Sequence, residues 1–358
     1  GHPGRGRGVD ASGRPAGGWA DRQGDGLPAW SAGAGSMADP ARDRVTGWFC
    51  DWGTGALFPC DHLDDGVRQR PSDRPDGGEV APRRHHREML RRSYLSEELR
   101  RGGQPRTWYL PITEDECSGA GRLFGGTGLG AAVRALEADA DRPLVWATGQ
   151  FISHAEPGET LVIEVELMAE GRATTQARAS GSVDGREVIA VFATLGRRDV
   201  HRSGVWVSPP DAPAPLDCPL FPSHSSSRSV SANLERRLVR GRIEAQDPAM
   251  DDGRVAMWVK VPDHLLVDPA FLAVLGDYVP WGGRDAVGGG LDGGQSLDNT
   301  LRVVDPVDTE WILVDVRVGS LVHGYAHGTV HLWSEDGHLL ATASQTCQFR
   351  NPRRMEPR

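Results

Sequence analysis

Apolar and polar residues alternate along the last part of the chain. From Trp311 onward, Ile312, Val314 and Val316 share one parity while Asp315 takes the other. A period of two indicates a strand with one buried face. Two further runs, 326–333 and 339–349, flank an Asp-Gly pair at 336–337, which predicts a β-hairpin.

An earlier stretch, 160–195, repeats this arrangement, with Asp184-Gly185 before its last run. An apolar segment with helical character precedes each copy, at 129–140 and at 269–279. We therefore predict a duplicated α+β unit, each with one long helix and an antiparallel sheet wrapped around it. The two sheets are expected to pair edge to edge, because pairing removes exposed strand edges.

The predicted domains follow from composition. Residues 105–208 form the first unit and 232–351 the second, with a Pro- and Ser-rich linker at 209–231 and a tail at 352–358. Further strands are predicted at 107–112, 144–153, 234–245 and 255–261. Asp277 falls late in the second apolar helix.

Residues 1–104 are dense in Gly, Pro, Arg and Asp and short of periodic apolar positions, so we predict a disordered, low-complexity extension. Its one apolar interlude, 47–62, contains Cys50, Cys60 and His62. Their spacing does not fit the close cysteine pair of a zinc site, so a flexible segment is expected here.

Charge and cysteine content narrow the function classes. The 358 residues carry a formal net charge of −9, which argues against a general nucleic-acid binder. No run reaches eighteen apolar residues, so no membrane span is expected. The first residues do not show the charged-then-apolar pattern of a signal peptide, so none is expected. Five scattered cysteines suit a reducing compartment, and we expect a cytoplasmic protein.

Motifs for other chemistries are weak. There is no G-x-S-x-G elbow for a Ser-His-Asp hydrolase. The glycines at 125, 126, 128 and 130 fit no phosphate-binding pattern and are equally explained by close packing of a helix onto a sheet. His323, His327 and His331 lie in a strand context, where four residues span roughly 13 Å and one ion cannot bridge them. We expect no metal and no cofactor.

Two stretches together resemble the acyl-CoA thioesterase II family, whose members carry two hotdog folds in one chain. The first is Arg-Leu-Phe-Gly-Gly at 122–126, which is similar to the family's entry to its first hotdog helix. The second is the C-terminal unit, with Ser-Leu-Asp at 296–298, Glu-Trp at 310–311 and the closing strand 340–351. The resemblance covers about residues 106–351 and implies a double-hotdog fold.

The resemblance also implies hydrolysis of fatty-acyl thioesters of coenzyme A. In the family an Asp, a hydroxyl residue and a Gln hold and polarise a water, and these correspond to Asp277, Ser296 and Gln345. Ser296 stands where the family usually has Thr, and Asn299 stands where members carry His. Acyl-CoA is then the expected partner, and a homo-oligomer, a dimer or larger, is expected.

The residues leave alternatives open. Asp277 is either catalytic or a helix-end residue, and Gln345 is either a site residue or a structural hydrogen-bond partner. Strand parity places Gln345 on an apolar face but groups Ser296 with Asp298 and Thr300, opposite Leu301, so Ser296 need not share the layer of Gln345. A hotdog hydratase or dehydratase, or a non-catalytic acyl-CoA or acyl-carrier binding protein, are the competing functions.

Overall fold

A computed structural model describes residues 48–50, 57–59, 91–222, 228–244, 246–288 and 290–352. The chain divides into two compact units, Gly1–Gly78 and Glu79–Arg358. In the first unit, β1 (Trp48–Cys50) pairs antiparallel with β2 (Leu57–Pro59). These strands correct the expectation of a flexible segment for residues 48–50 and 57–59, which pair with each other. Cys60 and His62 lie outside the described residues.

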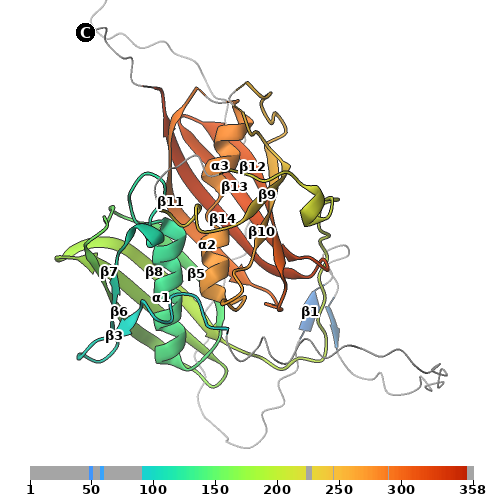
Figure 1. The fold of residues 1–358 in the computed structure, drawn as a ribbon. Helices are drawn as coiled ribbons and strands as arrows, with labels where there is room; N and C mark the ends of the chain where they lie inside the picture. The colour runs from blue at the N-terminus through green and yellow to red at the C-terminus, as the bar shows by residue number, and fades with distance from the viewer. Residues whose placement is uncertain are drawn as a thin grey trace, which may run out of the picture. The chain divides into compact units, whose positions relative to one another are not determined.

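The second unit is built on one continuous twelve-stranded sheet in the order β3-β4-β6-β7-β8-β5-β11-β14-β13-β12-β10-β9 (Figure 1). The two predicted sheets are therefore joined into one. We call the part of this unit that holds β3 to β8 the first half and the part that holds β9 to β14 the second half. The strands of the first half are β3 (Arg100–Arg101), β4 (Thr107–Pro111), β5 (Leu144–Phe151), β6 (Thr160–Glu170), β7 (Thr174–Val183) and β8 (Arg186–Gly196). Those of the second half are β9 (Arg236–Arg240), β10 (Arg254–Lys260), β11 (Asp292–Val303), β12 (Trp311–Val322), β13 (Tyr325–Ser334) and β14 (Leu339–Arg350).

The two halves join through β5 and β11, which pair antiparallel between Asp298–Arg302 and Trp146–Gln150. The side chains of Thr148 and Thr300, directly opposite each other, hydrogen-bond across this junction at 2.7 Å. The predicted edge-to-edge pairing is confirmed. Because β5 and β11 each pair with a strand on both sides, the junction has no exposed strand edge.

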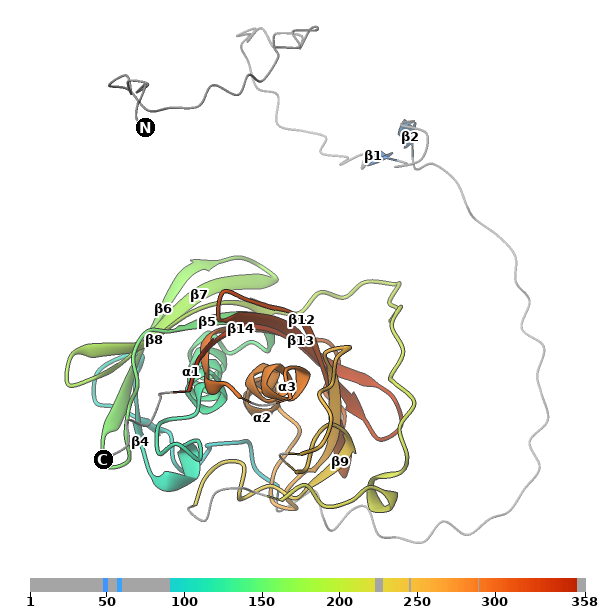
Figure 2. The same cartoon turned by 90° about the horizontal axis from the view of Figure 1, so that it is seen from above.

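Helix α1 (Gly125–Ala140) lies on the inner side of the curved sheet, beside the helical segments of the second half (Figure 2). It starts four residues before the predicted segment, because the glycine-rich stretch is helical. It ends where Asp141 adopts a left-handed φ of 49°, shortly before Pro143.

The predicted long second helix is broken into α2 (Pro269–Leu275) and α3 (Val279–Ala286). The side chain of Asp268 caps α2 by accepting a hydrogen bond from Phe271 N at 2.8 Å. Pro280 has no N–H with which to continue the α2 hydrogen-bond ladder, so the helix ends before it. The first part of the glycine-rich segment after Asp277 is α3.

The glycines of α1 permit close contact with another helix, whereas the sequence predicted contact with a sheet. A Cβ on Gly126 would lie 2.8 Å from Ala273 O and from Val274 Cα, and a Cβ on Gly130 would lie 2.7 Å from Ala270 O. Two backbones therefore touch where α1 crosses α2, as small residues allow.

We expect Gly126→Ala to destabilise the protein by about 1–3 kcal/mol, because the new methyl group meets backbone atoms that cannot move aside. Gly128→Ala is the matched control on the same helix. Its methyl group would lie 3.6 Å from the nearest atom, so it should be neutral or stabilise by up to about 1 kcal/mol. Denaturant unfolding of both variants measures the difference, and equal stabilities would contradict this explanation of the glycines.

Two stretches predicted as extension or linker are ordered parts of the larger unit, Glu79–Arg358. Residues 91–104, placed in the disordered extension, bury Leu95 and Leu99 and contain β3, and Arg92 N donates to His264 O at 2.8 Å. In the predicted linker, Pro213 O accepts a hydrogen bond from Trp258 Nε1 at 2.9 Å. These segments hold few apolar side chains, but each fits an existing apolar surface. Within the described part of the chain, no helix has the length and apolar character needed to cross a membrane.

Candidate active site

Asp277 lies in the short break between α2 and α3, not inside a helix as the sequence suggested. Its side chain is 3% exposed. The break turns the carboxylate toward the inner face of the sheet, where β11 and β14 run side by side. A carboxylate this deeply buried must have hydrogen-bond partners, since burial without them is costly.

A β-bulge brings Ser296 to the same face. Ser296 pairs with Cys347 on β14, but the next registered pair is Asp298 with Thr346, so Leu297 is an extra residue. The extra residue reverses the alternation of side chains. Ser296 consequently faces inward, although unbroken parity would have placed it outward with Asp298 and Thr300.

Gln345 lies on the inner face of β14 and is 3% exposed, as its parity predicted. Its Oε1 accepts a hydrogen bond from Val279 N at 3.2 Å. Val279 is the first residue of α3, and its N–H has no partner within that helix. The start of α3 thereby fixes the orientation of the amide and directs its Nε2 toward Asp277.

The three predicted residues lie together, because Ser296 and Gln345 both bond the same carboxylate oxygen of Asp277. Ser296 Oγ donates to Asp277 Oδ1 at 2.8 Å, and Gln345 Nε2 also donates to Asp277 Oδ1. Gln345 Nε2 donates in addition to Ser296 Oγ at 2.8 Å. The carboxylate, the hydroxyl and the amide thus form a closed triangle of hydrogen bonds.

The first half supplies a third hydrogen-bond partner for Asp277, which the sequence did not predict. Gly126 N, in the first turn of α1, donates to Asp277 Oδ2 at 2.6 Å. The residue before α1, Phe124, makes no side-chain cap, so Asp277 satisfies a helix N-terminus from the other half of the chain. The sequence signal was the Gly-Gly pair at 125–126, since a Cβ on Gly125 would lie 2.8 Å from Asp277 Oδ2.

Burial raises the pKa of Asp277 to about 6, from an ordinary value of 3.8. The hydrogen bonds from Ser296, Gln345 and Gly126 act in the opposite direction, and the nearby charge of Asp298 adds to the rise. Burial and the same two carboxylates raise the pKa of the Cys347 thiol to about 12. Cys347 is therefore a neutral thiol, while Asp277 changes charge just below neutral pH.

The first half has no equivalent polar group on its strands. When the halves are aligned on their last hairpin turns, Ala193 takes the place of Gln345 and Leu144 takes the place of Ser296. Both are buried apolar residues. The strand residues of the candidate site therefore come from the second half alone.

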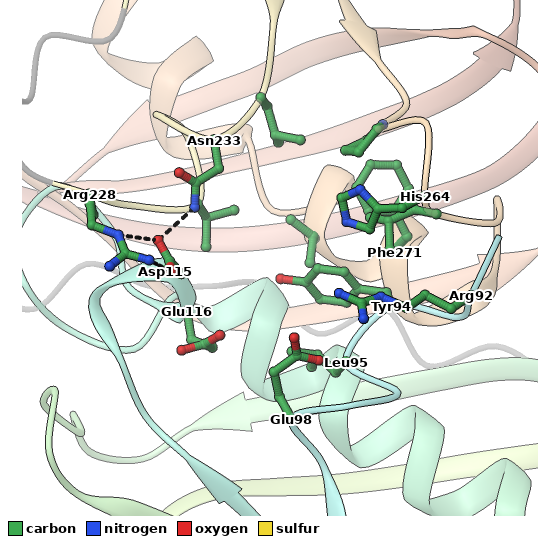
Figure 3. A pocket seen from close by; sticks show the side chains of 15 residues that line it. Arg92, Tyr94, Leu95, Glu98, Asp115, Glu116, Arg228, Asn233, His264 and Phe271 are labelled. Carbon is green, nitrogen blue, oxygen red and sulfur yellow. Dashed lines mark hydrogen bonds and ion pairs between the residues drawn. The ribbon is translucent and has the colours of Figure 1, made fainter. Parts of the chain in front are cut away.

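A pocket of about 340 Å³ is lined by Phe271 and Val274 of α2 together with residues from 92–98, 115–116, 228–234 and 262–265. The rings of Tyr94 and Phe271 line it with their centroids 5.9 Å apart. Asp115 is linked to Arg228 and Asn233 (Figure 3). The pocket does not include Asp277, but its lining reaches Val274, whose carbonyl oxygen accepts a hydrogen bond from Asp277 N at 3.3 Å.

Each half of the chain matches a known domain family. Residues 113–196 match the family model of the acyl-CoA thioesterase N-terminal domain, and residues 209–349 match that of the C-terminal domain. No curated protein matches the chain in sequence.

Solved structures share the fold. A structure named as a thioesterase, from Novosphingobium aromaticivorans, is 29% identical with a TM-score of 0.64, over 71% of this chain and 99% of that chain. A hot dog protein from Alicyclobacillus acidocaldarius is 23% identical with a TM-score of 0.63, over 71% and 96%. The acyl-CoA thioesterase II TesB2 of Mycobacterium marinum is 19% identical with a TM-score of 0.56, over 72% and 97%. With both domain models matched in order, the chain belongs to the acyl-CoA thioesterase family and has the hotdog fold.

Proposed function

We propose that this thioesterase hydrolyses acyl-CoA to a free fatty acid and coenzyme A by means of a water held by Asp277, Ser296 and Gln345. The observation that carries the proposal is the convergence of the hydroxyl and the amide on Asp277 Oδ1. Such a triangle fixes the carboxylate in one orientation, and a fixed carboxylate can direct the attack of a water.

In the proposed reaction the ionised Asp277 accepts a proton from the water as its oxygen adds to the thioester carbon. The carbonyl π electrons move onto oxygen, and the tetrahedral intermediate then collapses with cleavage of the C–S bond. The coenzyme A sulfur leaves as a thiolate and takes up the proton held by Asp277, which restores the ionised carboxylate. Ser296 and Gln345 hold Asp277 and the water in place and form no covalent bond.

The pocket beside α2 supports a place for the acyl chain. Phe271, Val274 and Leu265 give it an apolar floor. Its two arginines are already paired, Arg228 with Asp115 and Arg92 with Glu97. The additional carboxylates of Glu98 and Glu116 disfavour the phosphates of coenzyme A there. We therefore assign the pocket to the acyl chain and the phosphates to another surface.

The competing functions have less support. A hydratase needs a histidine beside the acidic residue. Among the described residues, the groups that hydrogen-bond the Asp277 carboxylate belong to Gly126, Ser296 and Gln345, and none of these is a histidine. A purely binding protein has no need of a buried carboxylate whose pKa is raised to about 6. Incubation with saturated acyl-CoAs and 2-enoyl-CoAs of several lengths separates the three. Hydrolysis releases free thiol, hydration removes the enoyl absorbance, and a binding protein does neither.

We expect kcat/KM to rise with pH through a midpoint near 6, because only the ionised form of Asp277 accepts the proton. The stability changes in the opposite sense. Since the pKa in the folded protein lies above its ordinary value, the contribution of Asp277 to stability is greatest below about pH 4 and is lost as the pH rises through about 6. A pH–rate profile measured with a saturated acyl-CoA tests the first statement, and a flat profile between about pH 5 and pH 8 would contradict it.

A further inference from the structure

Hydrolysis at the proposed site requires a hydrogen-bond donor for the carbonyl oxygen, because negative charge develops there in the transition state. The donors of the site are already used. Ser296 donates its hydroxyl hydrogen to Asp277, and Gln345 Nε2 donates to both Asp277 and Ser296. Gly126 N also donates to Asp277. A further donor is needed if the proposed function is correct.

Asn299 has the unused hydrogen-bonding capacity. It lies on β11 with 0% exposure, and within the described part of the chain neither its Oδ1 nor its Nδ2 has a hydrogen-bond partner. A buried amide without partners lowers stability, and such groups are rare in folded proteins. An apolar residue of similar size, such as leucine, would fill the position without that cost.

The register places Asn299 beside the site. On one side it pairs directly with Gln345 of β14, and on the other with Gly149 of β5. Directly opposite side chains lie on the same face, so Asn299 and Gln345 are neighbours on the inner surface. Gly149 has no side chain, and a Cβ there would lie 3.2 Å from Leu129 of α1, 3.5 Å from Ile189 and 3.6 Å from Val191, so apolar side chains pack over it.

The next residue of β11, Thr300, lies on the opposite face of the sheet from Asn299. Thr300 points to the opposite face, where its hydroxyl bonds that of Thr148. On the inner face, the side chain of β11 at this level is therefore that of Asn299. Its cross-strand neighbour Gln345 bonds the carboxylate of Asp277, which also accepts a hydrogen bond from the first turn of α1.

We propose that Asn299 is a catalytic residue whose Nδ2 donates a hydrogen bond to the thioester carbonyl oxygen. The bond strengthens when the water oxygen adds to carbon and the carbonyl electron pair moves onto oxygen. It weakens when the C–S bond breaks and the carbonyl re-forms. Asn299 keeps its protons throughout, and the proton from the water goes to Asp277. This assignment rests on the proposed function and adds a residue to its site.

Asn299→Leu tests the proposal in two ways. Loss of one such donor is expected to lower kcat by about 10²- to 10³-fold with a much smaller change in KM. The melting temperature should stay the same or increase, because a buried amide without partners is removed. Thr300→Val, the neighbour on the outer face, is the control and should keep the wild-type kcat.

Asn299→Asp is nearly isosteric and removes the N–H donors, so it should show a comparable loss of kcat if the leucine variant does not fold. A kcat within about threefold of wild type in either folded variant would overturn the proposal. A large fall in the melting temperature of both variants would also overturn it, because the amide would then have a structural role. If the wild-type protein releases no thiol from any acyl-CoA, the proposed function itself fails, whereas an active wild type with active Asn299 variants refutes only this inference.

Discussion

Asp277→Asn should lower the rate of acyl-CoA hydrolysis by about 10²- to 10⁴-fold, because the amide keeps the shape of the carboxylate but accepts no proton from water. The substitution also removes the charge that Ser296, Gln345 and Gly126 stabilise with hydrogen bonds. Free thiol release from a saturated acyl-CoA, measured at about pH 8 where the wild-type residue is ionised, gives the comparison.

The control is Asp285→Asn, which removes another buried carboxylate of the same helical region. Asp285 Oδ2 accepts a hydrogen bond from Arg242 N at 2.9 Å and makes none with Ser296 or Gln345. This variant should keep the wild-type rate. Asp277→Ala is a less suitable test than Asp277→Asn, because it leaves the N–H of Gly126 without an acceptor and costs about 1–3 kcal/mol of stability. A fully active Asp277→Asn protein would show that the carboxylate is structural.

Gln345→Ala should reduce kcat by roughly 100-fold or more, since the amide holds both Asp277 and Ser296. The loss of its hydrogen bond to the carboxylate removes one of the interactions that lower the pKa of Asp277. The midpoint of the pH–rate profile should therefore move upward. A pH–rate profile of the variant beside that of the wild type measures both effects.

Gln348→Ala is the matched control on the same strand. Its amide lies at the surface, where Nε2 donates to Gln295 Oε1 at 3.1 Å. The rate and the pH midpoint should both remain those of the wild type. If Gln345→Ala lowers stability but leaves kcat and the midpoint unchanged, Gln345 serves only to bind the start of α3 through Val279 N.

Local patterns in the sequence predicted much of the fold. Apolar alternation identified β12, although residues 311–316 are buried on both faces rather than on one. The Asp-Gly pairs identified the hairpins that close each half, where Asp184, Gly185 and Gly337 have positive φ. Such patterns involve residues that are close in sequence, so they can be recognised without knowledge of the tertiary structure. The polar residue on the apolar face of β14, Gln345, was visible for the same reason.

Features that depend on distant segments could not be predicted. The bulge at Leu297 turns Ser296 inward, and simple parity gave the opposite face. The break before Pro280 places Asp277 outside a helix, although the apolar run continued through it. The bond from Gly126 N to Asp277 joins residues 151 positions apart, and nothing in the local sequence specifies such a pair.

A single turnover in water enriched in ¹⁸O, with enzyme in excess over acyl-CoA, tests the proposed water attack most directly. If a water held by Asp277, Ser296 and Gln345 adds to the thioester carbon, the fatty acid released in that turnover carries one ¹⁸O atom and the protein carries none. Unlabelled fatty acid together with ¹⁸O in the carboxylate of Asp277 would show that this residue attacks the thioester itself, and would contradict the account.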